Sequence, residues 1–164
     1  MGILRLETEI HRHRGGQMSG YNNILVGLDL SEESAQVLDR AAQIAAHNDA
    51  KMSLAHIIEP LTFAYGGDVP MDLSEVQEQL QNQAKEQLRK AAASLNIPAE
   101  RQHVVLGQPA TEIHRLAEES GCDLIVIGSH GRHGLALLLG STANGVLHGA
   151  GCDVLAVRVH SPEE

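Results

Sequence analysis

A chain of 164 residues with a formal net charge of −9 is long enough for one domain with a buried core, but its charge argues against DNA or RNA as a partner. Aromatic residues make up only 2% of the chain, so aliphatic residues must fill the core, which suits helices on both faces of a buried parallel sheet. No apolar run approaches the roughly 20 residues of a membrane span, and two cysteines form no disulfide framework, so we expect a cytoplasmic protein without a membrane partner.

Residues 1–20 precede the first predicted strand and contain Arg and His residues together with paired glycines. They lack the continuous apolar core of a secretion signal, so we expect a flexible extension followed by one domain over residues 21–160. Met18 lies directly before this domain and is an alternative start of the chain. A short basic tail that contacts the acidic body is the other interpretation of this segment.

The first part of the domain is predicted to alternate between strand and helix. The aliphatic run Asn23–Leu28 predicts a buried strand that ends at Asp29. Ser31 is a candidate helix cap, because acidic residues follow it in the first turn. A second strand over Lys51–Ile58 leads into a loop over Glu59–Asp72. The predicted inner face of the helix is Ala35, Leu38, Ala42 and Ala45.

The middle of the chain continues this alternation. Ser74 is predicted to cap the longest helix, whose apolar residues recur at three-to-four spacing. A third strand is predicted over Arg101–Leu106, and Pro109 suits the first turn of the next helix, which ends at Ser120–Gly121. The apolar positions of the two helices are Val76, Leu80, Ala84, Leu88, Ala91 and Leu95 in the first, and Ile113, Leu116 and Ala117 in the second.

The last part contains a fourth strand over Asp123–Ile127, a glycine-rich loop, a helix from Ser141 to about His148, and a final strand over Val154–Val159. Strands that alternate with helices in this way indicate a parallel sheet with right-handed crossovers.

Three segments fall at the carboxyl ends of the predicted strands, where parallel α/β sheets bind ligands. These segments are Asp29, Ile58–Pro60 and Gly128–Gly140. Backbone N–H groups of a glycine-rich loop and the free N-terminus of a helix at Ser141 form an anion site, and a nucleotide phosphate is the anion we expect. Ser129 and Arg132 are candidate pocket residues, and Arg132 would supply a fixed positive charge.

These residues also have plainer structural interpretations. Glycines such as Gly128 and Gly131 often only make turns, and Asp29 is equally suited to capping the first helix. His56, in the middle of the second strand, is interpreted as a core histidine bonded to the backbone. Three histidines in or after the glycine-rich loop give a zinc site little support, because no third acidic or cysteine ligand lies nearby in the sequence. These histidines are His130, His133 and His148.

Five motifs make the chain resemble the universal stress proteins over about residues 21–159. They are NILVGLDLSEES, LAHIIEP, DLIVIGSHGRHG, LLLGSTANGVL and CDVLAVRV. The resemblance implies a five-stranded parallel sheet of order 3-2-1-4-5 with helices on both faces, in the adenine nucleotide α-hydrolase-like class. It also implies a dimer through the last strand, Val154–Val159, and a bound ATP, ADP or AMP, with Mg²⁺ accompanying a triphosphate.

The resemblance assigns binding roles to particular residues. Asp29 would meet the adenine base, and Ile57 would present backbone atoms to it. The phosphate pattern of the family is matched by Gly128, Gly131, Gly140 and Ser141, with Thr142 assisting.

One spacing departs from the family pattern. Eight residues separate Gly131 from Gly140, one fewer than in the nucleotide-binding members. Eight is the spacing of the branch typified by the founding enterobacterial member, which is regarded as not binding ATP, but that branch lacks the glycines kept here. We expect a shortened loop that still binds nucleotide.

We therefore predict a dimeric regulator of the stress response that binds an adenine nucleotide and signals to a protein partner through its bound state. The sequence has no Gly-x-Ser-x-Gly elbow, Walker lysine or His-Glu-x-x-His motif, so any ATP hydrolysis should be slow and incidental. Two alternatives remain. One is a nucleotide-free interaction module, and the other is a weak ATPase that depends on Mg²⁺ and Asp29.

Overall fold

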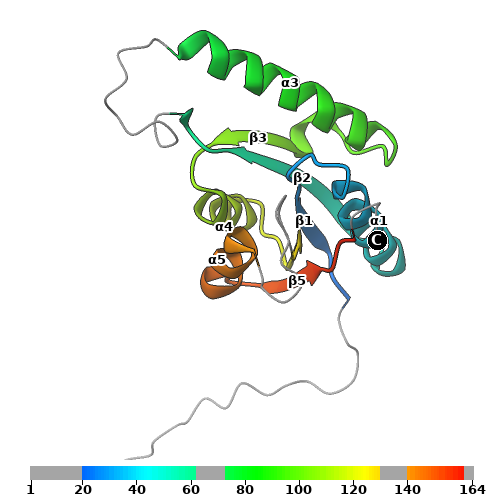
Figure 1. Cartoon of the computed structure of the whole chain (residues 1–164). Helices are drawn as coiled ribbons and strands as arrows, with labels where there is room; N and C mark the ends of the chain where they lie inside the picture. The colour runs from blue at the N-terminus through cyan, green and yellow to red at the C-terminus, as the bar shows by residue number, and fades with distance from the viewer. Residues whose placement is uncertain (1–19, 62–72, 130–139, 161–164) are drawn as a thin grey trace, which may run out of the picture.

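The computed structural model describes residues 20–61, 73–129 and 140–160, and Figure 1 shows how their strands and helices are arranged. The strands are β1 (Asn23–Gly27), β2 (Lys51–Ile58), β3 (Gln102–Leu106), β4 (Leu124–Gly128) and β5 (Asp153–Val157). The helices are α1 (Ser34–Asn48), α3 (Ser74–Ala93), α4 (Pro109–Glu119) and α5 (Ser141–Gly149), and a 3-10 turn, η1 (Ala99–Arg101), precedes β3. None of these helices is long and apolar enough to cross a membrane.

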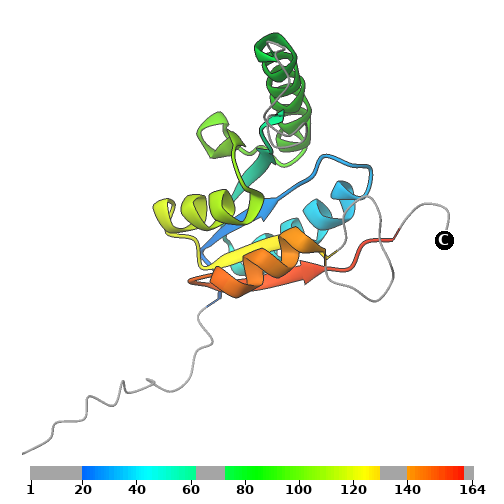
Figure 2. The same cartoon turned by 60° about the vertical axis from the view of Figure 1, so that its left-hand side comes forward.

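The five strands form one parallel sheet in the order β3-β2-β1-β4-β5, which confirms the predicted fold class and strand order. The central strand, β1, is completely buried at Ile24, Leu25 and Val26. Leu25 belongs to the core under α4 and α5, whereas Ile24 and Val26 belong to the core under α1 and α3. Figure 2 shows α4 and α5 together on one face of the sheet. A strand covered on both faces needs apolar residues throughout, which is why a short aliphatic run predicted it.

Helix α1 begins two residues later than predicted, with Glu33 and not Ser31 at the cap position. The Asp29 carboxylate accepts hydrogen bonds from the Ser31 N–H (3.0 Å) and the Ser31 hydroxyl (2.6 Å), so the chain makes a turn before the helix starts at Ser34. The predicted cap at Ser31 is therefore wrong. The predicted inner face is also shifted, because Ala35 is exposed. The buried residues of α1 are Val37, Leu38, Ala41 and Ala45.

The predicted apolar face of α3 is buried only in its second half. Leu88 is 1% exposed, whereas Val76 and Leu80 are 47% and 39% exposed. Helical periodicity finds the correct face of a helix, but it does not tell how far the sheet extends beneath that face. The predicted cap is displaced by one residue, because Ser74 is the first residue of the helix and Leu73 takes the cap position.

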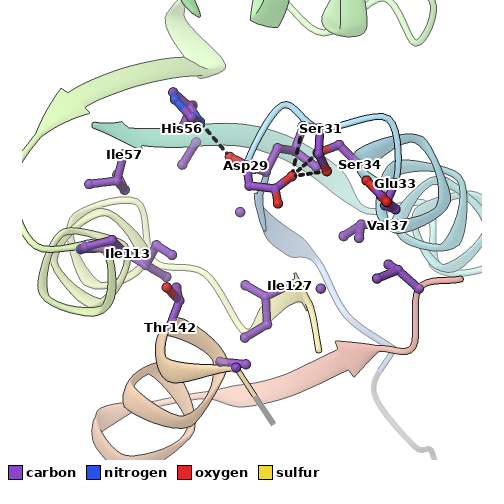
Figure 3. A pocket seen from close by; sticks show the side chains of 18 of the residues that line it. Asp29, Ser31, Glu33, Ser34, Val37, His56, Ile57, Ile113, Ile127 and Thr142 are labelled. Carbon is purple, nitrogen blue, oxygen red and sulfur yellow. Dashed lines mark hydrogen bonds between the residues drawn. The ribbon is translucent and has the colours of Figure 1, made fainter. Parts of the chain in front are cut away.

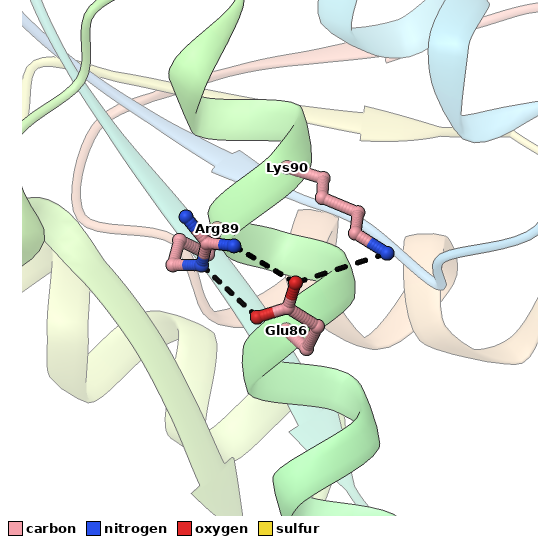
Figure 4. Close-up of polar contacts among 3 residues, drawn as sticks. All are labelled: Glu86, Arg89 and Lys90. Carbon is pink, nitrogen blue, oxygen red and sulfur yellow. Dashed lines mark hydrogen bonds and ion pairs between the residues drawn. The ribbon is translucent and has the colours of Figure 1, made fainter.

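The solvent side of α3 carries an ion-pair cluster, shown in Figure 4. Glu86 bonds to Arg89 at 2.8 Å and lies 3.7 Å from Lys90. The hydrogen bond from Arg89 is the main reason why the pKa of Glu86 is lowered. All three side chains are exposed, so the cluster adds little to the stability of the fold.

The predicted first turn and inner face of α4 are confirmed. Pro109 is the first residue of the helix, and its predicted inner face is buried. The helix ends at Glu119, and Gly121 follows two residues later with a φ of +61°, in the left-handed region that glycine enters without a steric cost. The Cys122 N–H then closes the helix end on the Ala117 carbonyl at 2.8 Å.

The two cysteines lie at the amino ends of β4 and β5, and both are half-buried free thiols. Burial, followed by the proximity of Cys152, raises the pKa of Cys122 to about 11. Cys122 is therefore a thiol and not a thiolate at neutral pH, and it packs as a small apolar side chain.

Asp123 joins the amino ends of β1 and β4, a contact that the sequence analysis missed. Its carboxylate accepts the N–H groups of Asn22 (2.8 Å) and Asn23 (3.0 Å) and the side-chain amide of Asn22 (3.2 Å). Tyr21 adds a second link, because its hydroxyl donates to Asp153 at the start of β5 (2.9 Å). These bonds hold the chain at the entrance to the central strand.

We expect Asp123→Asn to lower the free energy of unfolding at neutral pH by roughly 1–2 kcal/mol, because an amide replaces the bonds of a charged acceptor with weaker ones. Burial acts to raise the pKa of Asp123, but hydrogen bonds from Asn23 and Asn22 outweigh it and hold this pKa below its usual value. A carboxyl group whose pKa is lower in the folded state stabilises the fold above its unfolded pKa of about 3.9.

This stabilisation disappears as the pH falls through the lower pKa of the folded state. Urea denaturation of the wild type and of D123N between pH 7 and pH 2 therefore measures the contribution. The free energies of unfolding of the two proteins, plotted against pH, should begin to approach each other below about pH 4 and should meet below the lower pKa of the folded state. A constant difference over the whole range would show that the charge of Asp123 is not responsible.

Candidate functional site

A cavity of about 200 Å³ opens at the carboxyl ends of β1, β2 and β4, where the sequence predicted a site (Figure 3). Its floor is apolar and its rim is polar. The floor residues include Gly27, Val37, Ala55, Ile57, Ile113 and Ile127. The rim residues include Asp29, Ser31, Glu33, Ser34, Gly128, Gly140, Ser141 and Thr142. An apolar floor with a few polar groups at its edge is the usual character of a small-molecule site.

Three helices begin at this cavity. Ser34 starts α1, Pro109 starts α4 and Ser141 starts α5, and all three residues line the cavity. The first N–H groups of a helix have no partner within it, and the helix dipole places partial positive charge there. At α5 these groups belong to Ser141, Thr142 and Ala143, which line the cavity and suit an anion. At α1 the Ser34 N–H donates to the Ser31 carbonyl at 3.1 Å, and at α4 Pro109 has no N–H, so these two helices contribute mainly the partial positive charge of their dipoles. The sequence analysis identified the contribution of α5 but missed that of α4, although Pro109 after the third strand marked the start of that helix.

Asp29 lies at the end of β1, as predicted, and holds the turn that follows. Besides Ser31, it bonds to the hydroxyl of Ser34 at 2.7 Å, all through the same carboxylate oxygen, Oδ1. Figure 3 shows these contacts at the upper edge of the cavity. Asp29 therefore holds the turn before α1 but does not cap the helix, because Glu33 takes the cap position and no side chain makes a cap hydrogen bond. Asp29 also lines the cavity.

The two ends of the glycine loop are joined by a hydrogen bond. Ser129 is 7% exposed, and its carbonyl accepts the Gly140 N–H at 2.8 Å. Its own N–H donates to the Val157 carbonyl at 2.8 Å, so it is fixed to β5 as well. Gly140 and Ser141 therefore reach the same cavity as Gly128 despite the shortened spacing. Gly131 and Arg132 lie outside the described residues, as do His130 and His133.

His56 is half-buried and its Nδ1 bonds to the Leu28 carbonyl at 2.8 Å, which confirms that it bonds to the backbone. The next residue, Ile57, lines the cavity as expected. Glu33 was not predicted to line the cavity. Its place there depends on the turn at Asp29, which delays the start of α1.

The charge of the described rim is negative. It contains Asp29 and Glu33, and no lysine or arginine is among the described lining residues. Nor do the described residues contain a group of three His, Cys, Asp or Glu side chains placed to hold a metal ion. Among the described residues, only the helix N-termini therefore favour an anionic ligand, and Arg132 lies outside them.

The sheet order and the cavity at the strand ends define an α/β protein of the adenine nucleotide α-hydrolase-like class. The model of the universal stress protein family matches residues 20–158. Universal stress protein A homolog 1 of Coxiella burnetii is 43% identical over 139 residues, which cover 84% of this chain and 96% of the relative. The chain belongs to the universal stress protein family.

Solved structures agree with this assignment. The hypothetical protein MJ0577 superimposes with a TM-score of 0.72 and 26% identity, covering 87% of this chain and 99% of its own. A universal stress protein solved in complex with cAMP has a TM-score of 0.60 and 30% identity, covering 85% of this chain and 98% of its own.

Proposed function

We propose that this protein binds an adenine nucleotide in the cavity and acts as a cytoplasmic regulator of the stress response. The observation that carries the proposal is the meeting of three helix N-termini with Gly128 and Gly140 around one cavity. This arrangement suits an anionic group above an apolar floor. The similar protein that was solved with cAMP supports an adenine nucleotide as the class of ligand.

In this proposal the two ends of the ligand contact different elements. The base lies near Asp29 and the backbone of Ile57, on the apolar floor. The phosphates lie at the start of α5. The phosphate-binding residues proposed are Gly128, Ser129, Gly131, Arg132, Gly140, Ser141 and Thr142. Gly131 and Arg132 belong to the proposal on the basis of the family pattern alone.

The proposed role is binding and not turnover. Bound ATP, ADP or AMP would shift the population of conformations in the segments at 59–72 and 128–139, and a protein partner would recognise the change. Mg²⁺ would enter with the phosphates of a triphosphate. The nucleotide-free interaction module remains the alternative suggested by the eight-residue spacing.

The first prediction concerns Gly140→Val, which should lower nucleotide affinity at least about tenfold, or about 1.4 kcal/mol. Gly140 has φ −57° and ψ 155°, a conformation open to any residue, and valine keeps the N–H that bonds to Ser129. The added methyl groups would occupy space beside the phosphates. The measurement is calorimetry with ATP, AMP and cAMP, after acid release and mass analysis of any nucleotide that copurifies.

The matched control is Gly151→Val. Gly151 lies before β5, at the opposite end of the strand, and a Cβ added there meets no atom within 4 Å. This variant should bind as the wild type does. Equal affinity in all three proteins would reject the phosphate assignment, and a wild type that binds none of the nucleotides would reject the proposed function.

The negative rim leads to a second prediction. Because Asp29 and Glu33 repel phosphate charge, ATP should bind at least about tenfold more weakly in EDTA than with Mg²⁺. The singly charged phosphate of cAMP should lose less than about threefold under the same change, since it needs less neutralisation. Calorimetry of both ligands in both buffers makes the comparison. Equal Mg²⁺ dependence for the two ligands would contradict this account of the rim.

We also propose a homodimer through Val154–Val159. The strand β5 is an edge of the sheet, and an edge exposes hydrogen-bonding groups that a second copy can pair. The Val157 carbonyl accepts from Ser129 and so faces β4. The backbone of Ala156, one residue earlier, therefore faces away from β4 and towards the open edge.

Ala156→Pro removes the outward N–H of β5 and should convert the proposed dimer into a monomer. Sedimentation equilibrium gives the mass, and circular dichroism checks that the fold is kept. Two results would refute pairing through this edge. One is a wild type that is still monomeric at about 100 times the protein concentration used for calorimetry, and the other is a variant that keeps the mass of a dimer.

A further inference from the structure

The turn between β1 and α1 has an uncommon backbone conformation. Leu30 has φ +58°, in the left-handed region that is unfavourable for a residue with a Cβ. This turn carries Asp29 and leads to Ser34, where α1 begins at the cavity. Contacts from neighbouring elements must therefore hold the turn in place.

Two of these contacts come from β2 and meet at the peptide groups of Leu28. The Leu28 N–H donates to the Ala55 carbonyl at 2.9 Å. The Leu28 carbonyl accepts from Nδ1 of His56 at 2.8 Å. Since a carbonyl only accepts, Nδ1 must carry the proton. A side chain thereby continues the pairing of β1 with β2 one residue beyond the end of β1.

The surroundings of His56 indicate that its side chain acts through its hydrogen bond to Leu28 and not by filling the core. Its side chain lines the cavity of the proposed site and also a second hollow of about 250 Å³ between β2 and α3, lined by Leu80 and Gln87 among others. Figure 3 shows the ring on the upper side of β2, with its hydrogen bond reaching the chain next to Asp29. A half-buried imidazole between two open spaces contributes little packing, so its main contribution is the hydrogen bond.

We propose that His56 is a positioning residue: its bond to the Leu28 carbonyl fixes the turn that carries Asp29, and so prepares the rim of the cavity for its ligand. The consequence for affinity rests on the proposed function. The fixing of the turn itself is a property of the protein without ligand. Preorganisation of this kind raises affinity by removing the cost of ordering the rim when the ligand binds.

Two variants separate the hydrogen bond from the shape of the side chain. His56→Leu removes the donor, whereas His56→Asn places an amide N–H where Nδ1 lies in the imidazole. Without ligand, amide hydrogen exchange at Ser31 and Ser34 should be at least about tenfold faster in H56L than in the wild type. Exchange at Asn23, at the other end of β1, should stay the same. H56N should restore slow exchange at Ser31 and Ser34.

Calorimetry with Mg·ATP then tests the effect on the cavity. H56L should bind at least about tenfold more weakly, and H56N within about threefold of the wild type. Unchanged exchange in H56L, or a failure of H56N to restore it, would overturn the positioning role. A third outcome separates the two proposals. If exchange is faster in H56L but neither the wild type nor any variant binds nucleotide, the proposed function is refuted and the positioning of the turn by His56 is supported.

Discussion

The structure depends on one constraint, which is that β1 is paired on both edges and covered on both faces. Its neighbours are β2 and β4, so the chain must leave β1 to one side and later return on the other. The helices that make these crossovers separate at the carboxyl end of β1. Parallel sheets form their ligand crevices at this reversal of strand order, and here Asp29, Ile57 and Gly128 are brought together there.

The strands were predictable because burial on both faces requires aliphatic residues in an unbroken run. The limits of β2 are as predicted, and those of the other strands differ from the predicted ones by at most two residues. The start of α1 was not predictable in the same way. The N–H and hydroxyl of Ser31 donate to the Asp29 carboxylate, so Ser31 belongs to a turn and does not cap the helix. The described site residues were predictable from their positions at strand ends, which meet in space once the strands are parallel. Glu33 and the start of α4 depend on how the crossovers pack, and local sequence does not contain that information.

The net charge of −9 and the acidic rim both repel a phosphate, so the proposed phosphate site needs a source of attraction other than side-chain charge among the described residues. Side-chain charge acts over a Debye length of about 8 Å in the cell, whereas backbone N–H groups at helix starts act at contact. If the proposed phosphate site is correct, its described groups would attract an anion weakly from a distance and hold it mainly by contact at the helix starts. Selectivity then depends on shape, and the turn fixed by His56 becomes part of that shape.

The hydrogen bond between Ser129 and Gly140 also bears on how such loops evolve. Because it joins the ends of the connection directly, the position of Ser141 does not depend on how many residues lie between them. Ten residues lie between these two ends, and loop-closure entropy for eleven in place of ten would cost only about 0.1 kcal/mol more. A change of one residue in the length of this connection therefore has little effect on where α5 begins.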